Sequence, residues 1–287
     1  MYRTSLARVP AQQFLARLAV IVVFAMTATR AAAAPLLWNQ LGSAAEVTNS
    51  GFGPNLGFYG GGGPIDQIGN PAYVPGVFGN ALTLGPGSYS TPFRVRNVVW
   101  SNVDQHLNAN RGTIEAWFKQ GQNPVGFSHG IYRIFDGAYG LGSGIGMWSD
   151  ENAANPRLMF GMDFGGTYTG VSHNISPLNG TWIHLAGVWD RNGIDGSSDT
   201  LRLYVNGSVA ASTTVAGWGN VVGQFADIAG GNDELIAGKF AVDNLKVYDT
   251  ALTDFSNRFN ESSIPEPSCA WLAGLGVLGL CRWRRGA

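Results

Sequence analysis

Short runs of β-branched and aromatic residues recur along this chain, separated by clusters of Gly, Asn, Asp and Pro. The clearest run spans residues 113–119, where Ile114, Ala116 and Phe118 alternate with polar or larger residues. Such alternation predicts a strand that buries one face, because successive side chains of a strand point to opposite sides. No stretch between the two ends of the chain has sustained helical periodicity, so the sequence predicts an all-β fold.

Three further regions favour strands. Residues 182–189 and 240–248 are rich in large apolar residues, and Asn206-Gly207 separates strand-like runs at 201–205 and 208–212. Asn-Gly between such runs is a strong β-hairpin signal. Strands this numerous need two packed sheets or a barrel to cover their edges. Trp117, Trp182 and Tyr204 lie on the best-patterned strands, so we expect them to pack in or near the core.

Four segments also resemble, in order, the strand motifs of laminin-G-like domains in the concanavalin A-like lectin/glucanase superfamily. They are Val77-Phe78-Gly79-Asn80-Ala81-Leu82-Thr83-Leu84 with Gly87-Ser88-Tyr89, Gly112-Thr113-Ile114-Glu115-Ala116-Trp117, the segment from Trp182-Ile183-His184 to Leu203-Tyr204-Val205-Asn206-Gly207, and Asp243-Asn244-Leu245-Lys246-Val247-Tyr248-Asp249-Thr250-Ala251-Leu252. These motifs define strands and turns and specify no activity. The resemblance implies a jelly-roll β-sandwich of two antiparallel sheets over residues 34–261.

The N-terminus has the pattern of a secretory signal peptide. Arginines precede a short apolar run at 18–26, and alanines 31–34 follow it. A charged region, a short apolar region and small residues distinguish a signal peptide from a membrane span. Pro35 would hinder cleavage after Ala34, so we expect cleavage after Ala33 or earlier. Residues 1–33 are therefore expected to be the signal peptide, with a signal helix.

The C-terminus combines Pro265-Glu266-Pro267-Ser268, an apolar run at 269–281, and the arginines Arg282, Arg284 and Arg285. Arginines after an apolar segment favour a cytoplasmic location for that end. The order resembles the PEP-CTERM sorting signal, also known as the ice-binding-protein C-terminal motif, of Gram-negative bacteria that make exopolysaccharide. The resemblance implies a precursor anchored in the inner membrane, processing by an exosortase, and release to the cell surface or extracellular matrix.

Residues 262–287 are therefore expected to form a sorting segment whose apolar run is a hydrophobic, transmembrane helix that projects away from the sandwich. The run is shorter than the ~20 residues of a spanning helix, so a buried core segment is the alternative.

Without the two ends, the chain has 11 basic and 18 acidic residues, a net charge of −7. This acidic composition argues against nucleic acid as a partner.

Candidate catalytic groups are sparse. Both cysteines, Cys269 and Cys281, lie in the tail. The laminarinase-like glucanases that share this sandwich carry an E-x-D-x-x-E strand, and this sequence has no such strand. It also has no G-x-S-x-G turn and only scattered histidines. We therefore expect no enzyme activity. His184 is expected to be a packed or hydrogen-bonded structural residue.

Sugar-binding proteins use the flat faces of aromatic rings against sugar C–H groups. The candidate ligand-binding residues, which lie outside the strongly patterned strands, are Trp148, Trp218, Tyr132, Tyr139 and Tyr168. The alternative is that they are partly buried core or rim residues, as large aromatic side chains commonly are.

The family resemblance also implies one structural Ca²⁺ where the first strand, an early turn and the last strand meet. Asp243 corresponds best to that position, with backbone carbonyls near Trp38 and Gly85 as further oxygen ligands. The alternative is that Asp243 accepts hydrogen bonds from backbone amides, or that Asn244 caps a bulge.

The expected function is that of an exported, non-catalytic protein that binds a glycan or matrix polysaccharide. A structural or adhesive surface protein without a small ligand is one alternative. A diverged glycoside hydrolase or lyase is the other.

Overall fold

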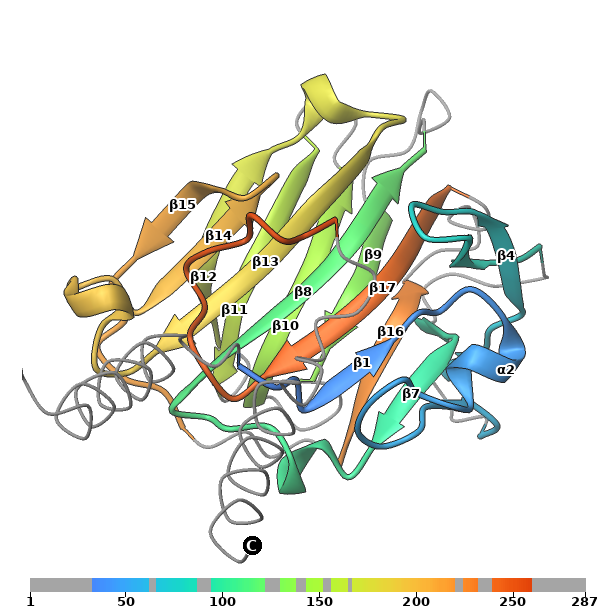
Figure 1. Cartoon of the computed structure of the whole chain (residues 1–287), viewed down its shortest axis with the longest axis horizontal. Helices are drawn as coiled ribbons and strands as arrows, with labels where there is room; N and C mark the ends of the chain where they lie inside the picture. Colours follow the sequence, from blue (N-terminus) through green and yellow to red (C-terminus); the bar gives the residue numbers. More distant parts are fainter. Residues whose placement is uncertain are drawn as a thin grey trace, which may run out of the picture. The chain divides into compact units, whose positions relative to one another are not determined.

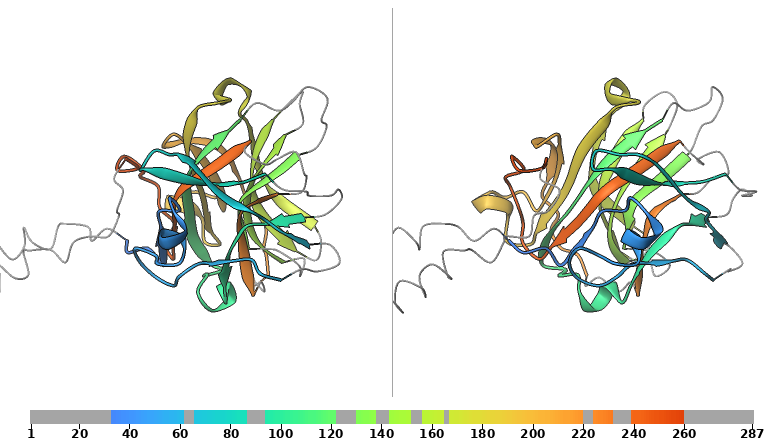
Figure 2. Two further views of the ribbon diagram at one scale, coloured as in Figure 1. Left: turned by 90° about the vertical axis from the view of Figure 1, so that its right-hand side faces the viewer. Right: turned by 45° about the vertical axis from the view of Figure 1, so that its right-hand side comes forward.

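The computed structural model describes residues 33–61, 66–86, 94–121, 130–137, 143–151, 156–164, 167–219, 224–231 and 239–259. This part of the chain forms two antiparallel β-sheets that pack against each other (Figures 1 and 2). The arrangement confirms the predicted all-β, jelly-roll-like sandwich. The predicted terminal helices lie outside the described residues, as do the signal and sorting segments apart from Ala33.

Sheet A has the order β15 (Ser208–Thr213), β14 (Leu201–Val205), β13 (Trp182–Asp190), β8 (Arg111–Gln120), β17 (Phe240–Tyr248), β5 (Asn80–Leu84) and β4 (Pro71–Pro75), and β1 (Leu37–Asn39) also pairs with β17. Sheet B has the order β12 (Thr167–Asn174), β11 (Arg157–Phe164), β10 (Ser143–Glu151), β9 (Gly130–Asp136), β16 (Phe225–Gly231), β6 (Arg94–Arg96) and β3 (Asp66–Ile68). Strand β7 (Val98–Ser101) pairs with β16 and with β2 (Gly57–Phe58), and the β3–β6 pair is parallel.

Helical structure within the described residues is short. It comprises α2 (Ala44–Val47) and the 3₁₀ turns η1 (Val103–Gln105), η2 (Ser176–Leu178) and η3 (Ile194–Gly196). Ser43 caps α2 by accepting a hydrogen bond from the Glu46 backbone N–H. In this part of the chain, no helix has the length and apolar character needed to cross a bilayer.

The hydrophobic core lies between the two sheets. Ile114, Ala116 and Phe118 of β8 are buried in the same apolar cluster as Met147 of β10 and Phe160 of β11. The alternation predicted for residues 113–119 is therefore confirmed. The predicted hairpin is also present, since Asn206 and Gly207 have φ angles of 52° and 84°, and a two-residue type I′ turn requires positive φ at both positions.

The segment after β17 covers part of the outer face of sheet A, and we call residues 249–259 the C-terminal strap. Figure 1 shows it running back across β13 and β8. The strap is held by the Leu252 N–H, which donates to Thr113 Oγ1 at 2.9 Å, and by Phe255, whose ring lies 4.9 Å from that of Tyr204.

This strap explains where the predicted core aromatics lie. Trp117 and Tyr204 are buried, as expected, but they pack beneath the strap and not between the sheets. Trp182 is half-buried. The sequence alternation predicted which residues share a face, but it did not predict that both faces of sheet A would be covered.

Candidate functional site

Three glycines form a row across the outer face of sheet B. Gly146 of β10 is in register with Gly161 of β11, which is in register with Gly170 of β12. A side chain at Gly146 would collide with the indole of Trp148, and one at Gly170 with the ring of Tyr168 and the Phe160 carbonyl. One at Gly161 would collide first with the backbone of Thr169 and Gly170 and then with the ring of Tyr168. The missing side chains therefore let two aromatic rings lie close against the sheet.

Strand geometry directs these rings away from the core. Met147 and Phe160 point inward, so their neighbours Trp148 and Met159 point outward, directly across from each other in the β10–β11 register. The rings of Trp148 and Tyr168 meet over β11 with centroids 4.8 Å apart and an interplanar angle of 59°. Trp148, Met159 and Tyr168 are all half-buried, and this trio, with the glycine row, is the aromatic surface.

A charged cluster borders the aromatic surface. Asp136 of β9 is in register with Gly146 on one side and with Asp227 of β16 on the other. Arg133 lies 2.8 Å from Asp136 and 3.9 Å from Asp227, measured between Nε or Nη1 and Oδ2. Asp227 is fully buried, and this burial raises its pKa to about 7 although the charge of Arg133 opposes the rise.

The far side of the cluster is closed by a second arginine. Arg96 of β6 lies between the rings of Tyr59 and Phe225, with its Cζ 4.8 Å and 4.5 Å from their centroids. Its guanidinium also pairs with Asp66 at 3.1 Å. Stacking and ion pairing together hold this guanidinium in place, with a side-chain exposure of 3%.

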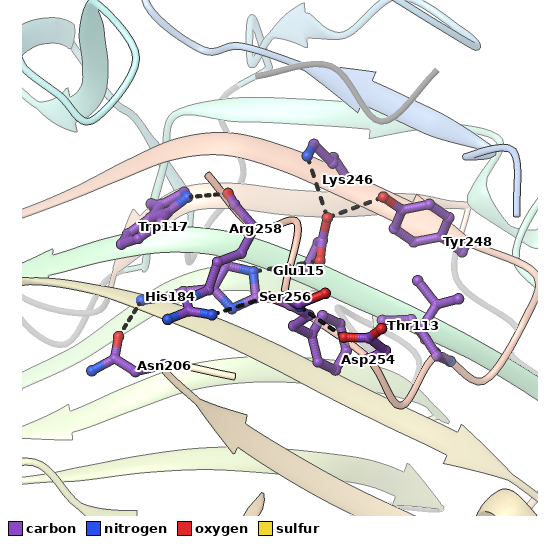
Figure 3. A network of polar contacts seen from close by, with 12 residues as sticks. Thr113, Glu115, Trp117, His184, Asn206, Lys246, Tyr248, Asp254, Ser256 and Arg258 are labelled. Carbon is purple, nitrogen blue, oxygen red and sulfur yellow. Dashed lines mark hydrogen bonds and ion pairs between the residues drawn. The ribbon is translucent and has the colours of Figure 1, made fainter. Parts of the chain in front are cut away.

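A different polar network lies on sheet A, beneath the strap (Figure 3). Tyr248 donates its hydroxyl hydrogen to Glu115 Oε1 at 3.0 Å, and Lys246 Nζ lies 3.4 Å from the same oxygen. His184 Nε2 is 3.4 Å from Glu115 Oε2, and the His184 backbone N–H donates to Asn206 Oδ1.

This network is structural. Burial works to raise the pKa of Glu115, but the hydrogen bond from His184 and the charge of Lys246 outweigh it, so the pKa lies below its ordinary value. His184 is 2% exposed, as expected for a packed structural histidine. The covering strap leaves Glu115, His184 and Lys246 without a surface that a ligand could reach.

The structure separates the predicted sugar-binding residues. Trp148 and Tyr168 come together in the aromatic surface. Tyr132 is fully buried and stacks on Phe240 at 4.7 Å, which argues against its predicted role because no face of its ring reaches solvent. Trp218 is 9% exposed and donates its indole N–H to the Ala109 carbonyl, so its position also argues against sugar binding. Tyr139 lies outside the described residues.

The predicted calcium ligand has other partners in the structure. Asp243 is fully buried in β17, and its Oδ2 accepts the backbone N–H groups of Val77 at 2.6 Å and Phe78 at 2.9 Å. These contacts agree with the alternative expectation, in which Asp243 accepts hydrogen bonds from backbone amides. Among the residues that the structure describes, no group of three or more His, Cys, Asp or Glu side chains is placed to hold a metal ion. Calcium binding at Asp243 remains a prediction.

Sequence reasoning missed the glycine row and the charged cluster. Asp136 and Asp227 are far apart in the chain and meet only because β9 and β16 are neighbours. The one usable signal was the spacing Gly146–Trp148 and Tyr168–Gly170, which places each ring beside a glycine on the same face of its strand.

Comparisons with known proteins agree with the fold. The sequence matches the family described as the concanavalin A-like lectin/glucanases superfamily over residues 96–255. A search of curated proteins gave no match. Among solved structures, the chain is similar to one of botulinum neurotoxin type C, a toxin whose cell entry depends on interaction with two ganglioside molecules. The TM-score is 0.56 and the sequence identity 14%, over 79% of this chain and 50% of that one.

Two further toxin structures are similar to the same extent. The binding domain of botulinum neurotoxin DC in complex with rat synaptotagmin II gives a TM-score of 0.56 at 14% identity, over 79% of this chain and 52% of that one. The botulinum neurotoxin type G receptor binding domain gives a TM-score of 0.53 at 14% identity, over 78% of this chain and 50% of that one. This chain thus spans about half the length of the toxin chains, and such low identity concerns the fold alone. The family match covers more than half of the chain and agrees with the two-sheet structure, so the protein belongs to the concanavalin A-like lectin/glucanases superfamily.

Proposed function

We propose that the outer face of sheet B binds carbohydrate through Trp148 and Tyr168, in an exported, non-catalytic protein. The observation that carries the proposal is the pair of half-buried rings held against a row of glycines. Rings held by the sheet lose little conformational entropy on binding, and their faces suit the C–H faces of sugar rings. The similar type C toxin, whose cell entry depends on gangliosides, lends support from the same fold.

No catalytic role is assigned to Asp136 and Asp227, the two carboxylates of the charged cluster that pair with Arg133. Glycoside hydrolysis needs an acid and a base or nucleophile that flank the scissile bond. Asp227 is fully buried and Asp136 is paired with Arg133, so both carboxylates are held within the charged cluster beside the binding surface. A structural or adhesive role without a glycan ligand is the outcome if no carbohydrate binds.

Removal of either ring should weaken binding. Trp148→Ala and Tyr168→Ala are each expected to lower the affinity for the best ligand on a glycan array by about thirtyfold, because truncation of a central aromatic contact costs roughly 2 kcal/mol. Isothermal titration with that glycan measures the change. Trp182→Ala is the matched control, because Trp182 is also half-buried but lies on the outer face of sheet A. Equal affinity of Trp148→Ala and the wild type would refute the proposed surface.

A glycine substitution provides a test that keeps both rings. At Gly146 the nearest atoms to an added Cβ belong to the far edge of the Trp148 indole, so Gly146→Ala displaces the ring and leaves the backbone in place. The variant should remain folded by circular dichroism and lose binding to the same degree as Trp148→Ala.

We further propose that the predicted terminal signals direct export and exosortase processing, with release to the surface or matrix of a Gram-negative cell. Pro265-Glu266-Pro267 is the segment that an exosortase would read. Its replacement by three alanines should retain the protein in the inner membrane of an exosortase-bearing host, as measured by fractionation and immunoblotting. Release equal to that of the wild type would contradict the processing proposal.

A further inference from the structure

Resting on the proposed function, we infer that the glycan bound by the outer face of sheet B is a polyuronate, whose carboxylate is bound by Arg157 and Asn174 beside the aromatic surface. Both residues are exposed, and they lie directly opposite each other in the β11–β12 register. Three features point to this ligand: the positions of the two side chains, the hydrogen-bond donors they offer, and the charges of the neighbouring strands.

The two residues stand next to the aromatic surface. Arg157 precedes Met159 by two residues on β11, so the two side chains point outward together. Trp148 is opposite Met159, which makes Arg157 its diagonal neighbour across the β10–β11 pair. Diagonal neighbours are about 7–8 Å apart, within reach of aromatic and long side chains. A sugar ring stacked on Trp148 can therefore extend a substituent to the Arg157 guanidinium.

The groups that these side chains offer to a ligand are donors. Asn174 Oδ1 accepts the Ser176 backbone N–H at 2.9 Å and the Ser176 hydroxyl at 2.8 Å, which orients the side-chain amide. The Nδ2 group, which only donates, is therefore the part of Asn174 that a ligand can use. The Arg157 guanidinium has five N–H donors and no acceptor, and it can pair with a carboxylate through two parallel hydrogen bonds. Donors on neighbouring strands suit a ligand group that only accepts, such as the carboxylate of a uronic acid.

The backbone register also places Asp150 of β10 opposite Arg157, on the side away from Asn174. Because a guanidinium has five donors in a planar fork, one edge can bind a ligand carboxylate while another faces an acid of the protein.

The neighbouring strands do not oppose an anion. Among the described side chains in the strands of sheet B, the arginines outnumber the carboxylates: Arg94, Arg96, Arg133 and Arg157 against Asp66, Asp136 and Asp227. The described charges of this sheet therefore favour an acidic ligand, although the chain as a whole is acidic.

The aromatic rings determine how such a sugar lies. The face of an aromatic ring attracts C–H groups and repels anions. A uronic acid would therefore lay its C–H face on Trp148 and direct its carboxylate along β11, away from the rings and toward Arg157. Ser172, which is exposed and opposite Met159, lies where it can exchange hydrogen bonds with the sugar hydroxyl groups.

The test compares polymers that differ in their charged group. The full chain is titrated with alginate and polygalacturonate, with the same two polymers after carboxyl reduction, and with dextran sulfate. Physiological salt screens the repulsion between the acidic chain and an acidic polymer beyond about 8 Å, so all titrations are made there. We expect a polyuronate to bind about tenfold or more tightly than its reduced form, because hydrogen bonds to a charged group are stronger than those between neutral groups. Dextran sulfate should bind more weakly than the polyuronate.

Two variants examine the proposed carboxylate ligands. Arg157→Gln removes the charge, and Asn174→Asp keeps an acceptor for Ser176 while it replaces the donor by an anion. Each should weaken polyuronate binding by about tenfold and remove most of the preference over the reduced polymer. Arg111→Gln is the matched control, because Arg111 is also exposed but lies on β8 of sheet A, and this variant should bind like the wild type.

The outcomes separate failure of the inference from failure of the proposed function. Reduced polymers that bind as tightly as the polyuronates, with loss in Trp148→Ala, would overturn the inference and leave the carbohydrate-binding surface standing. Wild-type affinity of Arg157→Gln for the polyuronate, or tighter binding of dextran sulfate, would overturn the carboxylate assignment in the same way. Absence of any binding that depends on Trp148 would refute the proposed function itself.

Discussion

Replacement of Glu115 by alanine is expected to lower the free energy of unfolding by about 3–5 kcal/mol, because it leaves a buried cation without its partner. Lys246 has a side-chain exposure of 3%, and Glu115 Oε1 lies 3.4 Å from its Nζ. The same substitution removes the acceptor for the Tyr248 hydroxyl. Chemical denaturation followed by tryptophan fluorescence at pH 7 measures the loss.

Matched variants test whether the unpaired charge causes the effect. Removal of both charges in Glu115→Leu/Lys246→Met leaves no buried ion, so this double variant should be clearly more stable than Glu115→Ala. A double variant as unstable as Glu115→Ala would assign the loss to packing. A loss below about 1 kcal/mol in Glu115→Ala would show that the network contributes little to the fold.

The pH dependence of this effect has a definite sign. The pKa of Glu115 lies below its ordinary value of 4.5 in the folded protein. The carboxylate therefore stabilises the fold above about pH 4.5, and this contribution disappears as the pH falls through the folded-state pKa. The difference in stability between the wild type and Glu115→Ala should accordingly become smaller in acid.

The second large effect is expected from Asp227. Its contribution to the pH dependence of stability should have the opposite sign to that of Glu115, because its pKa is raised and that of Glu115 is lowered. Burial raises its pKa from 3.8 to about 7. Between these values the folded protein binds a proton that the unfolded chain has released, so stability falls as the pH rises. The slope is about 1.4 kcal/mol per pH unit, and the full contribution is about 4 kcal/mol.

Asp227→Asn tests this expectation. Asparagine cannot ionise, so the variant should lack the decline between about pH 4 and pH 7, and its stability relative to the wild type should be greatest at pH 8. Asp136→Asn serves as the control, because Asp136 pairs with Arg133 at 2.8 Å and its loss should not remove the decline. Parallel pH profiles for the wild type and Asp227→Asn would show that Asp227 is ionised at little cost in the folded protein.

Local pattern in the sequence was sufficient to predict the strands and much of the core. Alternation at residues 113–119 predicted that Ile114, Ala116 and Phe118 share the buried face, and Asn206-Gly207 predicted the hairpin. Both depend on contacts between residues close in the chain, which the period of a strand and the φ angles of a turn determine. Strand motifs in the right order then led to the two-sheet sandwich.

The candidate site required the tertiary structure, because cross-strand register and coverage are properties of the whole fold. Sequence reasoning named Tyr132 and Trp148 equally, and only the pairing of β9 and β10 placed the first in the core and the second on the outer face. Gly146 is in register with Gly161, and Asp136 with Asp227. The sequence between the residues of each pair contains no pattern that predicts this register. The strap likewise turns the outer face of β8 into a buried one, because residues from the end of the domain return to cover it. The sequence by itself thus determined the faces of individual strands, and the assembly of the sheets decided which faces meet solvent, ion pairs or ligand.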